Sequence, residues 1–248
     1  MKRAKNGFTL IELLVAMAMA SIAIVVIVSA YTVQVRAKNI QEAITDMNQT
    51  ARAAMEIMTH EIRMAGLDPT EDADARIITA DVGELIFSTD NRDDAGTNAP
   101  DEDCCDPNEQ LRYALTNDGA GDGINDTIAD GTECHLGRET GSGLIAAHGC
   151  SGGTNGLQPL ARNVDALNFV YLDEDGNVLG APVGDPDAIR VIEVTIVARA
   201  GTDSRGFLTS DYTNNQAYEN LQGDVILPAQ GDGFRRLRLA TTIYCRNL

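Results

Sequence analysis

The chain has 248 residues, a net charge of −18 and 44% apolar residues, enough for one membrane helix and one globular domain. Residues 1–36 carry four basic residues and one acid, so residues 37–248 carry 15 basic and 36 acidic residues, a net charge of −21. This acidic remainder lacks the basic surface that nucleic-acid binding needs, and the absence of tryptophan argues against stacking platforms for sugars or bases.

The beginning of the chain predicts a membrane helix. Three basic residues precede an apolar run, and no charged residue occurs from 13 to 33. About twenty apolar residues cross a bilayer core as a helix, and basic residues hold their end on the cytoplasmic side. Glu12 is the exception in this run. An ionisable residue in a membrane segment is by default functional, although a place at headgroup depth or in the first helical turn is an alternative.

The residues around Glu12 form a recognisable motif. Gly7-Phe8-Thr9-Leu10-Ile11-Glu12 resembles the type IV prepilin signature. The resemblance implies cleavage between Gly7 and Phe8 by a prepilin peptidase and N-methylation of Phe8. It also implies that Glu12 serves assembly by neutralising the terminal amine of a neighbouring subunit, which makes two buried charges tolerable together. A cleaved secretory signal peptide is the alternative, but its apolar core would be shorter and end at a small-x-small site.

The helical pattern continues beyond the membrane segment. Apolar residues recur at steps of three and four from Ile40 to Ala65, with polar residues between them. The first proline is Pro69, and it closes a stop signal that begins at Gly66. We therefore expect one nearly continuous helix over about 9–65, apolar all round in its first half and amphipathic in its second.

The rest of the chain predicts short strands. A stretch from about 116 to 156, rich in Gly, Asp, Asn and Thr, predicts irregular structure held by cysteines or ions. Strands beside one long helix indicate an α+β fold, in which the helix packs on an antiparallel β-sheet as in pilins. The candidate strands are 76–80, 84–88, 110–115, 166–172 with 178–179, 188–199 and 235–244.

These observations give a domain organisation in four parts. We expect a leader peptide at 1–7, a transmembrane or filament-core helix at 8–33 and an amphipathic helix at 34–68. A β-rich extracytoplasmic domain follows at 69–248, with a Cys- and Asp/Gly-rich insert at about 90–156.

The five cysteines are disulfide candidates if the domain is exported. Their odd number leaves one thiol free or paired between chains, and two vicinal cysteines are strained when bonded to each other, so each of them is expected to reach another partner. A zinc site built on Cys134-His135 and His148-x-Cys150 is an alternative, but its spacing matches no zinc-finger pattern. The candidates are Cys104, Cys105, Cys134, Cys150 and Cys245.

No cofactor is expected, although one acidic loop suggests calcium. Aspartates alternate with glycines over 117–126, as in half of a calcium loop. Ala120 stands where an oxygen ligand is expected and no glutamate closes the loop, so a solvated turn-rich loop is the favoured alternative. The candidate ligands are Asp118, Asp122, Asp126 and Asp130.

Three later segments narrow the resemblance to minor pilins of the PilW type. They are 61–66, 156–171 and 235–247. The resemblance implies a minor pilin that is inserted in the bacterial inner membrane, processed and built into a type IV pilus at the cell surface, where it helps to start the filament. Its partners would be other pilins and minor pilins, and no enzymatic activity is expected, since no nucleophile–base arrangement, phosphate loop or redox Cys-x-x-Cys is present.

Two alternatives remain at this point. A minor pseudopilin of a type II secretion system shares the same N-terminus. A membrane-anchored, calcium-dependent adhesion module would use the acidic insert instead, and its ligand binding would be lost with a chelator.

Overall fold

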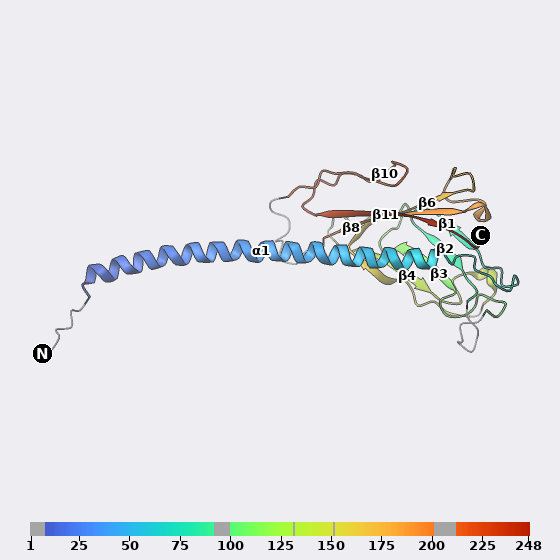
Figure 1. Ribbon diagram of the computed structural model, residues 1–248, viewed down its shortest axis with the longest axis horizontal. Helices are drawn as coiled ribbons and strands as arrows, with labels where there is room; N and C mark the ends of the chain where they lie inside the picture. The colour runs from blue at the N-terminus through green and yellow to red at the C-terminus, as the bar shows by residue number, and fades with distance from the viewer. Residues whose placement is uncertain (1–7, 92–99, 131, 151, 201–211) are drawn as a thin grey trace. The chain divides into compact units, whose positions relative to one another are not determined.

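The computed structural model describes residues 8–91, 100–130, 132–150, 152–200 and 212–248 (Figure 1). The chain divides into two compact units, one ending at Ala43 and the other running from Ile44 to Leu248. Within the described residues, one long α-helix precedes eleven β-strands in three antiparallel sheets. The predicted fold class, α+β with a long N-terminal helix packed on antiparallel strands, is confirmed, although the strands form three sheets instead of one.

Helix α1 (Leu10–Ile62) starts and ends within three residues of its predicted bounds. The large apolar side chains of its first part, up to Val35, are exposed. The predicted apolar stripe becomes a buried face in the second unit, because this part of the helix packs against the strands. Its buried members are Met47, Ala51, Ala54, Met58 and Ile62.

The stop signal after α1 is a glycine in the left-handed region. Gly66 has φ 74°, and its N–H donates to the carbonyl of Ser88 at 3.0 Å. A Cβ at this position would lie 2.9 Å from the backbone oxygen of Asn247, so both the backbone angle and the close approach require glycine. The helix therefore ends where the chain docks onto strand β2.

A five-stranded sheet takes its strands in chain order. The first three were predicted, whereas β4 lies inside the stretch predicted to be irregular, and β5 was not predicted. Strand β4 is polar and contains Gly137, so its sequence shows no strand pattern. It forms because β3 and β5 pair with its two edges. Arg112 of β3 and Glu139 of β4 stand opposite each other in this pairing. The strands are β1 (Ile77–Ala80), β2 (Leu85–Ser88), β3 (Gln110–Leu115), β4 (His135–Thr140) and β5 (Gln158–Arg162).

A four-stranded sheet has the order β11-β8-β6-β7, and all its strands were predicted. Strands β8 and β11 pair over nine residues without a bulge. The small two-stranded sheet of β9 and β10 was not predicted, because two or three residues are too short for a pattern. The strands are β6 (Val164–Leu172), β7 (Val178–Leu179), β8 (Val191–Arg199), β9 (Tyr218–Glu219), β10 (Val225–Leu227) and β11 (Arg236–Tyr244).

The two larger sheets and the second half of α1 share one hydrophobic core. Met58 and Ile62 from the helix pack with Phe87 and Tyr113 from the five-stranded sheet and with Phe169 from the four-stranded sheet. A smaller cluster lies between the other face of the four-stranded sheet and the β9–β10 pair. Figure 1 shows the second half of α1 lying beside the strands that cover its buried face.

Candidate functional site

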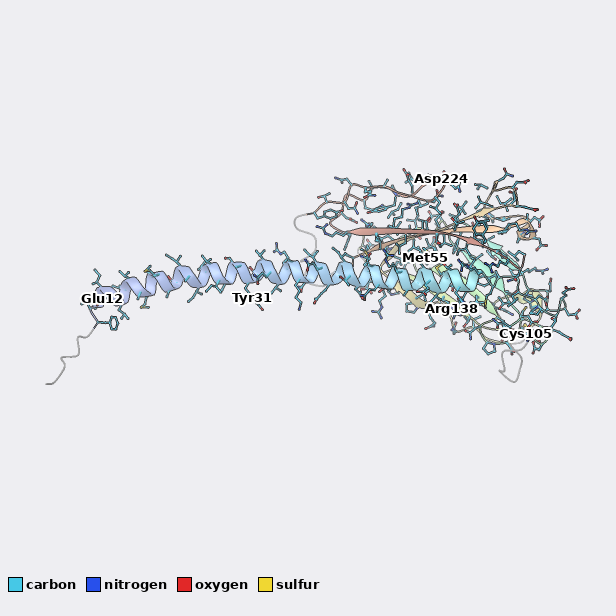
Figure 2. The ribbon with its side chains drawn as sticks, in the orientation of Figure 1. Glu12, Tyr31, Met55, Cys105, Arg138 and Asp224 are labelled. Carbon is cyan, nitrogen blue, oxygen red and sulfur yellow. A yellow bond between two sulfur atoms is a disulfide. The ribbon has the colours of Figure 1, made fainter. Side chains whose placement is uncertain are left out.

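The strongest candidate site is the start of α1, where Thr9 is the N-cap. The Thr9 backbone N–H and hydroxyl donate to Oε2 of Glu12 at 2.9 and 2.8 Å, and the Glu12 N–H donates to the Thr9 hydroxyl at 3.3 Å. This reciprocal arrangement is a capping box, which satisfies amides that a helix N-terminus leaves unpaired. Figure 2 shows Glu12 at this end of the helix. The Thr-x-x-Glu spacing was visible in the sequence, but the capping box was not predicted.

The capping box leaves one carboxylate oxygen of Glu12 accessible to another group. Its hydrogen bonds use Oε2, and within the described residues Oε1 has no hydrogen-bond partner. The side chains of Glu12 and Phe8 are both exposed, Phe8 to 92%. Gly7, on the other side of the predicted cleavage point, lies outside the described residues. The chain therefore offers an accessible carboxylate oxygen four residues after the predicted new terminus.

The helix that follows is long and apolar enough to cross a membrane by its length and composition. Its most apolar window buries none of its residues inside the structure. A helix that is apolar all round needs lipid or other protein surfaces around it.

The cysteines are only partly as predicted. Cys105 and Cys150 form a disulfide with their Cα atoms 5.4 Å apart, so Cys105, one of the two vicinal cysteines, pairs with a distant partner. The expectation that most of the cysteines are bonded is wrong in this structure, because Cys104, Cys134 and Cys245 are free and buried. The thiol of Cys104 donates to the carbonyl of Ala73, and Cys134 lies beside Thr116. Burial raises the pKa of Cys104 and of Cys245 to about 12.

Three of the four predicted calcium ligands, Asp118, Asp122 and Asp126, act as turn-forming groups. Asp118 accepts hydrogen bonds from the N–H groups of Gly121, Asp122 and Gly123 at 2.7 to 3.2 Å. Asp126 accepts from Gly119 at 2.7 Å. These bonds fold the loop upon itself, and it is tied to β6 through the N–H of Leu167, which donates to Gly123 at 2.8 Å.

No group of three or more His, Cys, Asp or Glu side chains gathers as a metal site in the described part of the chain, which includes Asp118, Asp122, Asp126 and Asp130. The structure therefore does not bring these four carboxylates together. The alternative zinc set is also split, because Cys150 is consumed by its disulfide with Cys105.

One serine–histidine contact qualifies the expectation that the chain has no nucleophile–base pair. Ser88 Oγ lies 3.1 Å from Nε2 of His148. Ser88 is fully buried, and its hydroxyl accepts from the N–H of Arg76 at 3.1 Å and donates to the Arg76 carbonyl at 3.4 Å. A hydroxyl enclosed in this way cannot meet a substrate, so the pair ties β2 to the 3₁₀ turn Ala146–His148.

Sequence reasoning missed a buried cluster of charges. Arg199 and Arg236 stand opposite each other on β8 and β11, and both side chains are 0% exposed. Asp165 of β6 lies between them, 2.7 Å from Nε of Arg236 and 3.5 Å from Nε of Arg199. Two like charges opposite each other repel, and the carboxylate offsets this repulsion. The sequence does place an arginine in each of two predicted strands. That the two arginines face each other follows only from the register of the strands.

Comparison with known proteins points to the same end of the chain. Residues 2–28 match the family described as the prokaryotic N-terminal methylation motif. Among solved structures, the chain is similar to a type IV-like pilin from Thermus thermophilus, with 13% sequence identity, coverage of 81% of this chain and 97% of that chain, and a TM-score of 0.47. Likeness at this level says nothing about function. No curated protein matches the sequence.

The matched segment contains the start of the apolar helix α1, and it supports the assignment of the chain as a type IV pilin in the broad sense that includes pilins and pseudopilins. Such a chain fits anchoring in the inner membrane and later placement in a pilus at the cell surface. It also fits assembly with other pilins and processing by a prepilin peptidase. Proteins of this class generally have a structural and not an enzymatic role.

Proposed function

We propose that this protein is a minor pilin of the PilW type, which is cleaved between Gly7 and Phe8, methylated at Phe8 and built into a type IV pilus, where it helps to start the filament. The observation that carries the proposal is the capping box at the start of the apolar helix. Glu12 fixes the first helical turn through Oε2 and keeps Oε1 accessible. An amine from a neighbouring subunit can therefore bind Glu12 without unwinding the helix.

Processing is tested first, by intact mass and N-terminal sequencing of the protein from its native membrane. The expected terminus is methylated Phe8. A terminus at Met1 would leave a plain anchored protein, and cleavage near Ala20 would make it an ordinary secreted protein; either result would overturn the proposal.

The role of Glu12 is tested with two substitutions that separate its functions. Glu12→Gln keeps an oxygen that accepts the Thr9 hydrogen bonds but removes the charge, whereas Glu12→Ala removes both. If charge recruits the neighbouring amine, both variants are processed normally and neither co-assembles with partner pilins. Co-assembly of Glu12→Gln at the wild-type level would show that capping alone is needed.

The same motif also suits a minor pseudopilin of a type II secretion system. Deleting the gene separates the two, because loss of pili with normal secretion supports the minor pilin. Loss of exoprotein secretion with normal pili would support the pseudopilin.

A calcium-dependent adhesion module gains no support from the acidic loop. Three of its carboxylates, those of Asp118, Asp122 and Asp126, accept hydrogen bonds from backbone N–H groups of the loop itself. Calcium binding at Asp118, Asp122, Asp126 and Asp130 stays a proposal that titration of the full chain with Ca²⁺ would test.

A further inference from the structure

A groove runs between the second half of α1 and strand β11, with a volume of about 670 Å³. One wall is a stripe of five residues of α1 and of Arg63, which directly follows the helix, and the other is a run of three consecutive strand residues. Met55, which lines this groove, is labelled on α1 in Figure 2. We call it the α1–β11 groove; its lining residues are Arg52, Met55, Glu56, Thr59, His60, Arg63, Leu239, Ala240 and Thr241.

The strand wall of the α1–β11 groove is a sheet edge. β11 is the outermost strand of its sheet, and it pairs with β8 along all nine residues on one side. No strand of the described part of the chain pairs with its other side. Because successive side chains of a strand point to opposite faces, three consecutive lining residues mean that the backbone edge itself borders the groove. An unpaired edge is a template for an added strand.

The helix wall has a length that suits such a strand. Its residues follow steps of three and four from Arg52 to Arg63, so they form one stripe on the helix. Eleven residues of helix rise about 16 Å, and an extended chain covers this distance in about five residues.

The charge of the groove is opposite to that of the chain as a whole. Arg52 and Arg63 line it together with one acid, Glu56, whereas the chain carries a net charge of −18. The guanidinium groups of Arg52 and Arg63 are exposed and form no ion pair with any described residue. Five other arginines of this unit pair with carboxylates, namely Arg76, Arg112, Arg138, Arg199 and Arg236.

We propose that the α1–β11 groove binds an extended, acidic segment of a partner protein, which adds to β11 as a further strand while its carboxylates face Arg52 and Arg63. The partner is a protein because the edge offers backbone N–H and C=O groups to another backbone. Pairing of β11 with β11 of a second copy is disfavoured, since it would bring two arginine-lined helix stripes together. The proposal does not depend on the function proposed above.

The test uses the full chain in its native membrane, with a photo-crosslinking amino acid in place of His60, which is exposed. The expected adduct contains a peptide with two or more carboxylates, identified by mass spectrometry. The double variant Arg52→Glu/Arg63→Glu should lower the yield about tenfold or more, because it places like charges in contact. The matched control is Arg162→Glu, an exposed arginine on β5, which should leave the yield unchanged.

Two further measurements test the same proposal. Replacing the carboxylates of the captured segment by lysine should restore crosslinking to the Arg52→Glu/Arg63→Glu variant. Hydrogen exchange should slow at the amides of Leu239, Ala240 or Thr241 when the partner is present, because an added strand protects them. A lipid adduct, no protein adduct, a captured segment without acids, a yield indifferent to charge reversal, or unchanged exchange in β11 would each overturn the proposal.

Discussion

Arg138 on β4 donates hydrogen bonds to both carboxylate oxygens of Glu61 on α1, from Nη2 to Oε1 at 2.8 Å and from Nε to Oε2 at 2.9 Å. The hydroxyl of Tyr113 on β3 donates to the same carboxylate. Burial and the Glu61 carboxylate raise the pKa of Tyr113, so its hydroxyl stays protonated and remains a donor. Because the paired side chains are only 22% and 20% exposed, this contact fixes the end of α1 on the five-stranded sheet. Figure 2 labels Arg138 near this end of the helix.

Removing one partner of this contact should destabilise the domain. Arg138→Ala leaves a half-buried carboxylate without its guanidinium, and we expect the free energy of unfolding to fall by ~2–3 kcal/mol. Tyr113→Phe removes one hydrogen bond and should cost ~1 kcal/mol. Chemical denaturation of the full chain in detergent measures both. Arg246→Ala, at an exposed position, is the control and should change the value by less than ~0.5 kcal/mol.

The disulfide should contribute more than any single hydrogen bond. Cys105 and Cys150 are 45 residues apart in sequence, and closing a loop of this size stabilises the folded state by ~3–4 kcal/mol in the chain-entropy description. We expect reductant to lower the free energy of unfolding by about this amount. The variant Cys105→Ser/Cys150→Ser should start at the lower value and not respond to reductant. A wild-type chain that is equally stable with and without reductant would contradict the assignment.

The buried cluster around Asp165 should be the least tolerant position of the four-stranded sheet. Asp165→Asn removes the carboxylate that lies between Arg199 and Arg236. Asp232, which pairs with Arg236 at 2.5 Å, offsets only part of the repulsion between the two arginines, and we expect a loss of ~3–5 kcal/mol. The double variant Asp165→Asn/Arg199→Gln removes one of the repelling charges, keeps the pair between Arg236 and Asp232, and should recover part of that loss. Thermal unfolding of the wild type, Asp165→Asn and the double variant measures their order of stability. A double variant less stable than Asp165→Asn would show that repulsion between the arginines is not the cause.

The features that the sequence predicted depend on local information. The periodicity from Met47 to Ile62 identified the buried face of α1, and alternation identified β8 and β11. The N-terminal motif could be identified because its parts, from Gly7 to Glu12, are contiguous and matched as a unit.

The features that the sequence did not predict depend on distant neighbours. β4 has little strand character and forms through pairing with β3 and β5. The partner of Cys105 is decided by which loops the sheet brings together, and the role of Asp165 by the register of three strands. Asp118 carries the residue type of a calcium ligand, but the turn around it uses its oxygens.

The three free thiols should be unreactive in the folded protein. Cys104, Cys134 and Cys245 are buried, which raises the pKa of each thiol and withholds the reactive thiolate. Mass spectrometry after maleimide treatment at about pH 8 should find no label on the native chain, three labels after unfolding and five after unfolding with reductant. Thr242→Cys, at an exposed position on β11, should label at once and shows that the reagent works. Prompt labelling of Cys104 in the native chain would contradict its burial.

Protonation of His148 should weaken the fold in mild acid. Burial lowers the pKa of His148 below its ordinary value of 6.5, while the carboxylates of Asp74 and Asp103 act in the opposite direction. The unfolded chain therefore binds this proton more readily than the folded chain. The contribution of neutral His148 to the free energy of unfolding is fully present above pH 6.5 and is lost as the pH falls toward the pKa of His148 in the folded state. We expect the free energy of unfolding to fall between about pH 7 and pH 5, with a smaller fall in His148→Gln, whose amide does not titrate there. His60→Gln, at an exposed position on α1, is the matched control for the substitution itself and should leave the free energy of unfolding at pH 7 unchanged. If His148→Gln and the wild type lose stability in parallel over this range, carboxylate titration is the cause and His148 is not.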